Sequence, residues 1–125
     1  MDSALRKKAL SHRIGTVCSA IAEMVNSSAF LLNDSDLKNL EERDQEIISG
    51  WIYAYRYYSS TNIDNVEFLL PGLKSDNPRI REQACDIIGD NRIFTLKPEL
   101  YKLLADPIDY VAEAAKYNHD TLQEA

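Results

Sequence analysis

The sequence predicts an all-α fold, a short α-α superhelical stack of about six helices arranged as hairpins. Apolar residues recur at three- and four-residue spacing in every segment, and no segment alternates with a period of two over a strand's length. The second half of the chain also repeats itself at an offset of 31 residues. A chain of 125 residues can bury one core without a metal or a disulfide, so we expect residues 1–125 to form a single domain.

The first half of the chain predicts two long helices. Residues 33–35 (Asn-Asp-Ser) separate them and offer side chains that can cap the second helix. The polar segment SSTN at 59–62 ends it. We interpret residues 1–60 as a divergent hairpin that caps the stack. The apolar faces carry Leu10, Ile14, Val17, Cys18, Ile21, Met24 and Val25 on the first helix, and Leu37, Leu40, Ile47, Ile48, Trp51, Ile52 and Tyr55 on the second.

The second half predicts four shorter helices whose boundaries are marked by caps, prolines and a glycine. Asp64 can cap the third helix, and Pro71 should kink or locally break it. Pro78 suits the first turn of the fourth helix, which Gly89 can end. The fifth helix starts near Pro98, and the turn spelled ADP leads into the sixth.

The last four helices form two copies of one pattern. A single helical hairpin cannot bury its apolar face alone, so stacked copies share a continuous core. Alanine at the same place in each copy lets paired helices approach closely, so we expect Ala84 and Ala115 to be buried at helix crossings. The matching pairs at offset 31 are Leu69 and Leu100, Leu73 and Leu104, Ile80 and Val111, Glu82 and Glu113, and Ala84 and Ala115.

The first copy, LLPGLKSDNPRIREQACDIIGD, resembles a HEAT-type repeat. It has an apolar first helix with a proline, an Asp-x-Pro turn and Ile-Arg-x-x-Ala on the second helix. LKPELYKLLADPIDYVAEAA is a looser copy, in which Ala112 replaces the arginine, so we assign two HEAT-like repeats to residues 63–122. The resemblance implies a structural role for Arg81, which in this family packs between turns and pairs with a turn carboxylate. Asp76 is the candidate partner.

Charge is unevenly distributed along the chain. The 20 acidic residues outnumber the 14 basic ones and give a net charge of −6, which argues against a nucleic-acid binder. Residues 63–125 hold twelve acidic and seven basic side chains, whereas residues 1–13 hold four basic side chains and one acidic. No apolar run approaches the roughly 18 residues of a membrane span, so we expect no membrane association. The acidity is therefore a property of the second half.

No motif for catalysis or for a cofactor is present in the sequence. His12 and His119 stand in no nucleophile or metal motif, and the four glycines form no phosphate-binding loop. Cys18 and Cys85 lie 67 residues apart among apolar residues, which is typical of buried free thiols in a reducing cytosol. We expect a cytoplasmic protein without enzymatic activity, cofactor or metal.

Tyrosine is unusually frequent, with seven residues in 125. Four of them, Tyr53, Tyr55, Tyr57 and Tyr58, spread around the second helix and cannot all be buried on one face. Either Tyr55 and Tyr58 pack while the others cover the surface, or the cluster contacts a partner.

The likeness to HEAT repeats, whose stacks act mainly as scaffolds, combines with the acidic excess to predict a non-catalytic module that binds a basic protein. Its most concrete form is a bacterial immunity protein of the contact-dependent inhibition type, which neutralises a basic, nuclease-type toxin. The chain is similar to such proteins in size, charge and architecture rather than in a motif. The alternative is an assembly adaptor that recognises a peptide or a subunit of a larger complex. An enzyme such as the lyases built on related short repeats lacks an acid–base pair here.

The predicted partner surface is an acidic stripe with an aromatic centre on the fourth and sixth helices. Glu82, Asp86 and Asp90 are spaced four apart, and the repeat places Glu113 and Tyr117 at equivalent positions. An ordinary solvated helix face is the alternative interpretation of the same residues. The stripe, called the acidic surface below, comprises Glu82, Asp86, Asp90, Asp109, Tyr110, Glu113, Tyr117 and Asp120.

Overall fold

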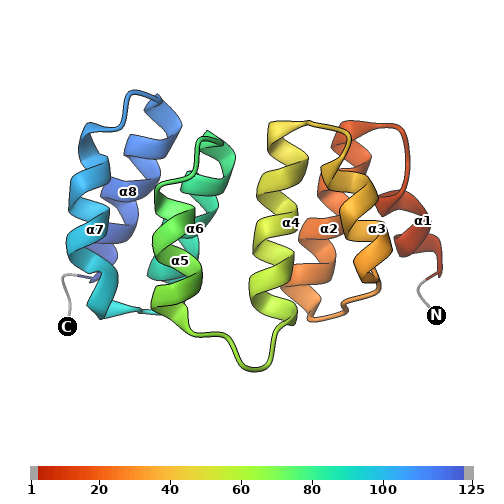
Figure 1. Cartoon of the computed structure of the whole chain (residues 1–125), viewed down its shortest axis with the longest axis horizontal. Helices are drawn as coiled ribbons and strands as arrows, with labels where there is room; N and C mark the ends of the chain where they lie inside the picture. The colour runs from red at the N-terminus through yellow and green to blue at the C-terminus, as the bar shows by residue number, and fades with distance from the viewer. Residues whose placement is uncertain (1–2, 123–125) are drawn as a thin grey trace. The chain divides into compact units, whose positions relative to one another are not determined.

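The computed structural model describes residues 3–122, which are helical and contain no strand (Figure 1). The all-α prediction is confirmed, but this range holds eight α-helices rather than about six. None of them is long and apolar enough to cross a membrane. In chain order they are α1 (Ser3–Ala9), α2 (Ile14–Ser27), α3 (Asp34–Glu41), α4 (Glu46–Ser59), α5 (Asn65–Leu73), α6 (Pro78–Asp90), α7 (Lys97–Lys102) and α8 (Asp109–Thr121), with 3₁₀ turns at Phe94–Leu96 and Leu103–Ala105.

The chain divides into two compact units, with the boundary between Thr61 and Asn62. We call residues 1–61 the N-unit and residues 62–125 the C-unit. Each unit consists of two helical hairpins, α1–α2 and α3–α4 in the N-unit and α5–α6 and α7–α8 in the C-unit. Within each unit the second helices of the two hairpins pack against each other, α2 against α4 and α6 against α8.

The prediction of two long N-terminal helices is wrong, because each is broken near its first third. Residues 10–13 separate α1 from α2, and residues 42–45 separate α3 from α4. The Arg43 guanidinium holds the first break open by donating to Ser11 O (2.6 Å) and Leu10 O (3.3 Å), carbonyls that would otherwise continue the helix. Asp44 adopts a left-handed φ of 59° at the second break. Apolar periodicity runs through both breaks, so the sequence pattern does not show them.

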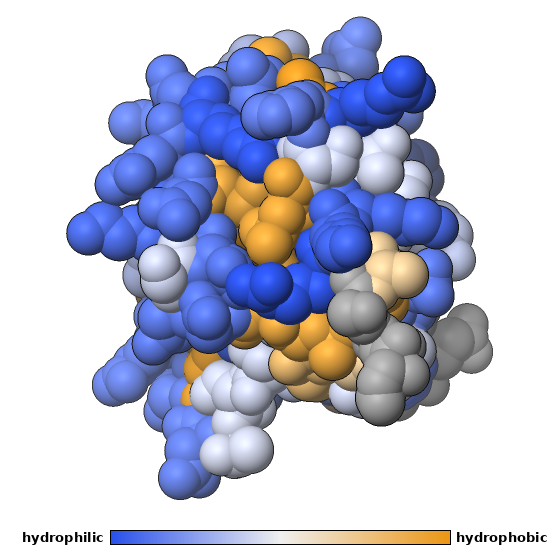
Figure 2. Space-filling model, turned by 90° about the vertical axis from the view of Figure 1, so that its right-hand side faces the viewer, coloured by the Kyte–Doolittle hydropathy of each residue, from blue (hydrophilic) through white to orange (hydrophobic). Residues whose placement is uncertain are grey.

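The N-unit core lies between α2 and α4. It is completed by Tyr55, whose buried hydroxyl donates to Leu32 O (3.0 Å) and accepts from Leu32 N–H (2.8 Å). Of the four clustered tyrosines only Tyr55 is buried, and the other three are half-exposed. Figure 2 shows one face of this unit, on which apolar atoms reach the surface in patches between hydrophilic side chains. Partly buried apolar side chains that pack on the core are Leu5, Leu10, Val25, Phe30, Leu31, Ile47 and Trp51.

Helix starts in the C-unit follow the predicted caps, whereas one helix end does not. Asp64 accepts from Glu67 N–H at the start of α5, and Pro78 occupies the first turn of α6. Helix α5 continues two residues past Pro71. Gly89 does not end α6, which runs to Asp90 and exits through Arg92 with a left-handed φ of 53°.

Gly89 is instead buried where α6 meets α8. A Cβ at this position would lie 2.9 Å from Asn118 Cβ and 2.6 Å from Asn118 Cγ, so a larger residue would overlap Asn118. Ala84 and Ala115 are both fully buried, as expected. The repeat position shared by Leu73 and Leu104 diverges, because Leu73 is buried and Leu104 is 37% exposed. Helix α7 ends at Lys102, and the tighter 3₁₀ turn that follows rotates Leu104 outward.

The four hairpins recur at nearly equal intervals in the sequence of residues 3–122. Second helices begin at Ile14, Glu46, Pro78 and Asp109, at intervals of 32, 32 and 31 residues. The sequence pattern disclosed only the last interval, because the N-unit uses large apolar residues where the C-unit uses alanine. With spacings of 31, 32 and 31 residues, matching positions on the four helices are Val17, Ile48, Ile80 and Val111, then Ile21, Ile52, Ala84 and Ala115, then Met24, Tyr55, Ile87 and Asn118. All are buried except Ile80, which is partly buried.

Candidate protein-binding surface

The acidic surface falls on α6 and α8 of the C-unit, two helices that contact each other directly. Asn118, buried on α8, donates from Nδ2 to Asp86 Oδ1 on α6 (2.9 Å) and to Ala114 O (2.8 Å). The absence of a side chain at Gly89 lets Asn118 come this close. The structure therefore brings the two halves of the predicted stripe together through a polar residue that the sequence analysis did not single out.

The α6 half of the surface contains a cation that the sequence analysis missed. Arg79 Nη1 pairs with Glu82 Oε1 (3.0 Å), and its guanidinium carbon lies 3.9 Å from the centre of the Tyr110 ring. Arg79 therefore links the acidic α6 to the aromatic edge of α8 and neutralises Glu82. Arg79 lies one turn before the predicted carboxylates. Its i, i+3 spacing to Glu82 was a signal from which this ion pair could have been predicted.

Asp86 is a half-buried carboxyl. Burial raises the pKa of Asp86, the hydrogen bond from Asn118 lowers it, and the charges of Glu82 and Asp90 raise it again. The net direction is upward. Asp86 therefore serves the contact between α6 and α8, whereas Asp90, one turn further on, is exposed.

The α8 half forms an exposed ridge of Asp109, Glu113, Tyr117 and Asp120, which we call the α8 ridge. These positions fall within about 80° of one another around the helix axis. Tyr117 is 71% exposed. Lys116 Nζ pairs with Asp120 Oδ2 (2.9 Å) and lowers the pKa of that carboxyl. Within residues 3–122, the carboxylates of Asp109 and Glu113 form no ion pair.

A groove of about 410 Å³ runs beside the ridge, between α8 and the 3₁₀ turn that follows α7. The exposed Leu104 side chain lies in it, and the neighbouring Tyr101 is 65% exposed. The Tyr101 ring is tilted against His119, with 5.8 Å between ring centroids. Tyr101 occupies the repeat position of Leu70. A tyrosine at a position that is apolar in the other repeat was therefore a signal in the sequence that Tyr101 is exposed. The groove is lined by Leu104, Ala112, Glu113, Lys116, His119 and Asp120.

Arg81 has the predicted structural role but a different partner. It does not pair with Asp76; its Nε and Nη2 donate to the two carboxylate oxygens of Asp106 (2.8 and 3.0 Å), and its Nη1 donates to Ser75 O (2.9 Å). Asp106 belongs to the turn of the next hairpin, so this bidentate pair joins the turns of both C-unit hairpins. Burial disfavours ionisation of Asp106, but Arg81 and the Ile108 N–H outweigh it and lower its pKa.

Residues 3–122 contain no group of three or more His, Cys, Asp or Glu side chains placed to hold a metal. Both cysteines are buried, and burial raises the pKa of Cys85 to about 12, so it stays a neutral thiol. Comparison with models of known protein families, with curated proteins and with solved structures finds no match.

Proposed function

We propose that this chain is a non-catalytic protein-binding module, and that its C-unit presents an acidic, tyrosine-bearing surface to a basic partner protein. The observation that carries the proposal is the α8 ridge, where Tyr117 is 71% exposed beside Asp109 and Glu113. Tyrosine offers a large contact area at a low cost in conformational entropy, and it is enriched among residues that dominate binding energy.

The charge of the C-unit supports a basic partner. Its twelve acidic side chains outnumber seven basic ones. Arg79, Arg81 and Lys116 are engaged by Glu82, Asp106 and Asp120, so much of the positive charge is neutralised locally. The excess carboxylates, Asp90, Asp109 and Glu113 among them, create a negative field that attracts a basic protein and raises its association rate.

The most concrete form of the proposal is a cytoplasmic immunity protein that inhibits a nuclease-type toxin. Such a toxin needs a basic groove for the phosphate backbone of its substrate. An acidic protein surface would compete with nucleic acid for that groove. The even spacing of four hairpins supports the further proposal that the whole chain is a HEAT-like repeat protein.

One observation favours the alternative, an assembly adaptor that holds a peptide. Leu104 lines the groove beside the ridge, and the exposed Tyr101 lies three residues earlier, on α7. An apolar peptide side chain could bury Leu104. The two candidates share Glu113 and Asp120, which belong to the ridge and also line the groove, but they differ in their central residues, Tyr117 for a basic toxin and Leu104 with Tyr101 for an apolar peptide.

The test uses a nuclease-toxin domain encoded beside this gene, or a partner that co-purifies from the native host. We expect Tyr117→Ala to weaken binding by about 2 kcal/mol, as for a residue that dominates an interface. Tyr101→Ala is the matched control, because Tyr101 is almost equally exposed but lies off the ridge. The association rate should also fall steeply with added salt. A larger loss from Tyr101→Ala, with little dependence on salt, would favour the adaptor instead.

A further inference from the structure

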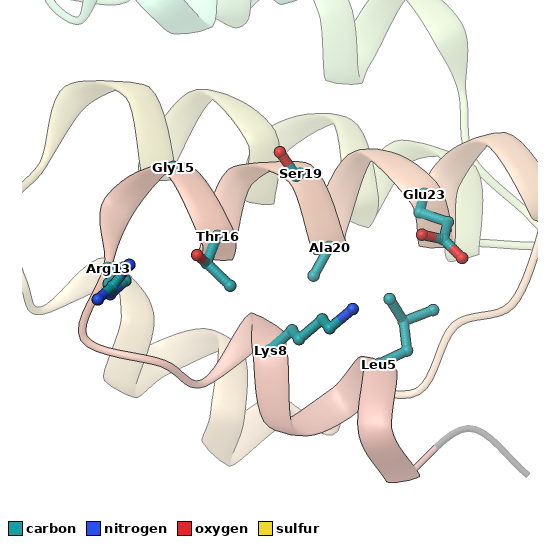
Figure 3. A pocket seen from close by; sticks show the side chains of 8 residues that line it. All are labelled: Leu5, Lys8, Arg13, Gly15, Thr16, Ser19, Ala20 and Glu23. Carbon is teal, nitrogen blue, oxygen red and sulfur yellow. The ribbon is translucent and has the colours of Figure 1, made fainter.

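The N-unit contains a second recess, a groove of about 670 Å³ between α1 and α2 (Figure 3). Its volume lies in the range of roughly 300–1,000 Å³ that is typical of small-molecule sites. Helix α1 contributes Leu5 and Lys8, and α2 with its preceding residue Arg13 contributes the opposite wall. Nothing in the proposed function uses this groove, which belongs to the other unit.

Two cations line the groove without a carboxylate partner. Among residues 3–122, neither Lys8 nor Arg13 forms an ion pair. The other nearby arginines are committed to the fold, Arg6 through Asp36 (2.9 Å) and Arg43 through backbone carbonyls. Lys8 and Arg13 are exposed, so their charge is available to a ligand.

The wall formed by α2 adds hydroxyl groups and open space. Thr16 and Ser19 both line the groove and each can donate one hydrogen bond, although the Ser19 hydroxyl points away from α1 in Figure 3. Gly15 leaves that wall free, because a Cβ built there meets no atom within 4 Å. Phosphate oxygens accept hydrogen bonds from cationic side chains and from hydroxyl groups. The groove offers both kinds of donor around an open recess.

The charges are ordered along the groove. Figure 3 shows Arg13 at one end and Glu23 at the opposite end, with Lys8 and Leu5 on the wall between them. An anionic group is therefore favoured near Arg13 and disfavoured near Glu23. The volume exceeds what a lone phosphate ion fills, and Leu5 and Ala20 provide apolar surface for an organic group.

From these observations we infer that the α1–α2 groove binds a small organic phosphate. Arg13 neutralises its phosphate together with Lys8, whose flexible side chain turns toward Arg13 from the direction drawn in Figure 3, Thr16 donates a hydrogen bond to a phosphate oxygen, and the organic group lies along Leu5 and Ala20. This site takes a small anion on the N-unit, whereas the α8 ridge takes a basic protein on the C-unit. The two proposals can therefore fail independently.

The test is a titration of the ¹⁵N-labelled full chain with glycerol 3-phosphate at constant ionic strength, followed by NMR. We expect saturable shifts of the amide signals of residues 13–20. Glycerol, which lacks the phosphate, should leave them unchanged. Succinate, a dicarboxylate of similar size, should bind more weakly. Shifts that do not saturate, or succinate binding as tight as that of glycerol 3-phosphate, would overturn the assignment.

Variants locate the site on the groove rather than on general positive charge. Lys8→Gln and Arg13→Gln should each weaken binding by about tenfold, the loss expected when one charge-assisted hydrogen bond is removed. Lys7→Gln is the matched control, because Lys7 is exposed on the same helix but does not line the groove. Gly15→Leu removes no charge and should abolish binding by filling the recess. An equal loss from Lys7→Gln, or full binding by Gly15→Leu, contradicts the proposal.

Discussion

Single residues decide how closely helices approach in this chain, and glycine shows this most clearly. Gly15 and Gly89 both lie inside helices without a left-handed φ, yet their surroundings are opposite. Gly15 faces open space, whereas Gly89 is in contact with the buried Asn118. From the sequence alone, Gly89 was predicted only to end a helix. The residue that requires its small size, Asn118, belongs to another hairpin.

This contrast predicts opposite effects of the same substitution. Gly89→Ala should destabilise the protein by about 1–3 kcal/mol, because the new methyl group overlaps a side chain held by two hydrogen bonds. Gly15→Ala should stabilise it by up to about 1 kcal/mol, because alanine has the higher helix propensity. Urea denaturation of the two variants measures both. Equal effects would contradict the crossing of α6 and α8 described above.

The pair of Arg81 and Asp106 should make the stability of the C-unit depend on pH. The folded state lowers the pKa of Asp106 below its usual 3.8. A lowered carboxyl pKa contributes stability that is complete above the unfolded pKa and is lost as the pH falls through the folded value. We therefore expect Asp106→Asn to lose stability at neutral pH and to lose less on acidification than the parent does. Thermal melts between pH 7 and pH 3 check this, and parallel acid curves for the two proteins would contradict it.

At the scale of elements, sequence periodicity located the helical segments but not their breaks. The caps Asp64 and Asn33 and the helix-starting Pro78 are local signals, and the structure confirms them. The break at residues 10–13 is bridged by Arg43, which lies in the break at residues 42–45 and donates to the carbonyls of Ser11 and Leu10. A pattern of apolar residues cannot show such a contact between distant segments.

The buried alanines give a test of the helix packing in the C-unit. Ala84→Leu and Ala115→Leu should each cost about 1–3 kcal/mol of folding stability, because a leucine overfills a position that has no exposed surface. Ala105→Leu makes the same change at an exposed position and should change stability by less than about 0.5 kcal/mol. If Ala84→Leu were as stable as Ala105→Leu, the register of the helices would be wrong.

At the scale of the whole molecule, the sequence correctly predicted which helices carry the acidic residues. It did not predict which of their carboxylates are free of ion pairs and available to a partner. All eight residues of the acidic surface lie on α6 and α8. Glu82 and Asp120 are paired with Arg79 and Lys116, and Asp86 accepts the hydrogen bond of Asn118. Asp90, Asp109 and Glu113 remain as exposed carboxylates without an ion pair in the described part of the chain. These pairings depend on side-chain geometry, which residue spacing alone could not give.

The affinity of a charge-reversed protein for its basic partner tests the central claim most directly. The triple variant Asp90→Lys, Asp109→Lys and Glu113→Lys reverses the three exposed carboxylates. The control Glu42→Lys, Glu67→Lys and Asp76→Lys changes the net charge equally at exposed positions outside the acidic surface. Circular dichroism should show that both variants keep the helical fold. We predict that the first variant weakens binding by about a hundredfold and the control by much less, because local complementarity rather than net charge holds the partner. Equal losses, or undiminished binding by the first variant, would contradict the assignment of this surface.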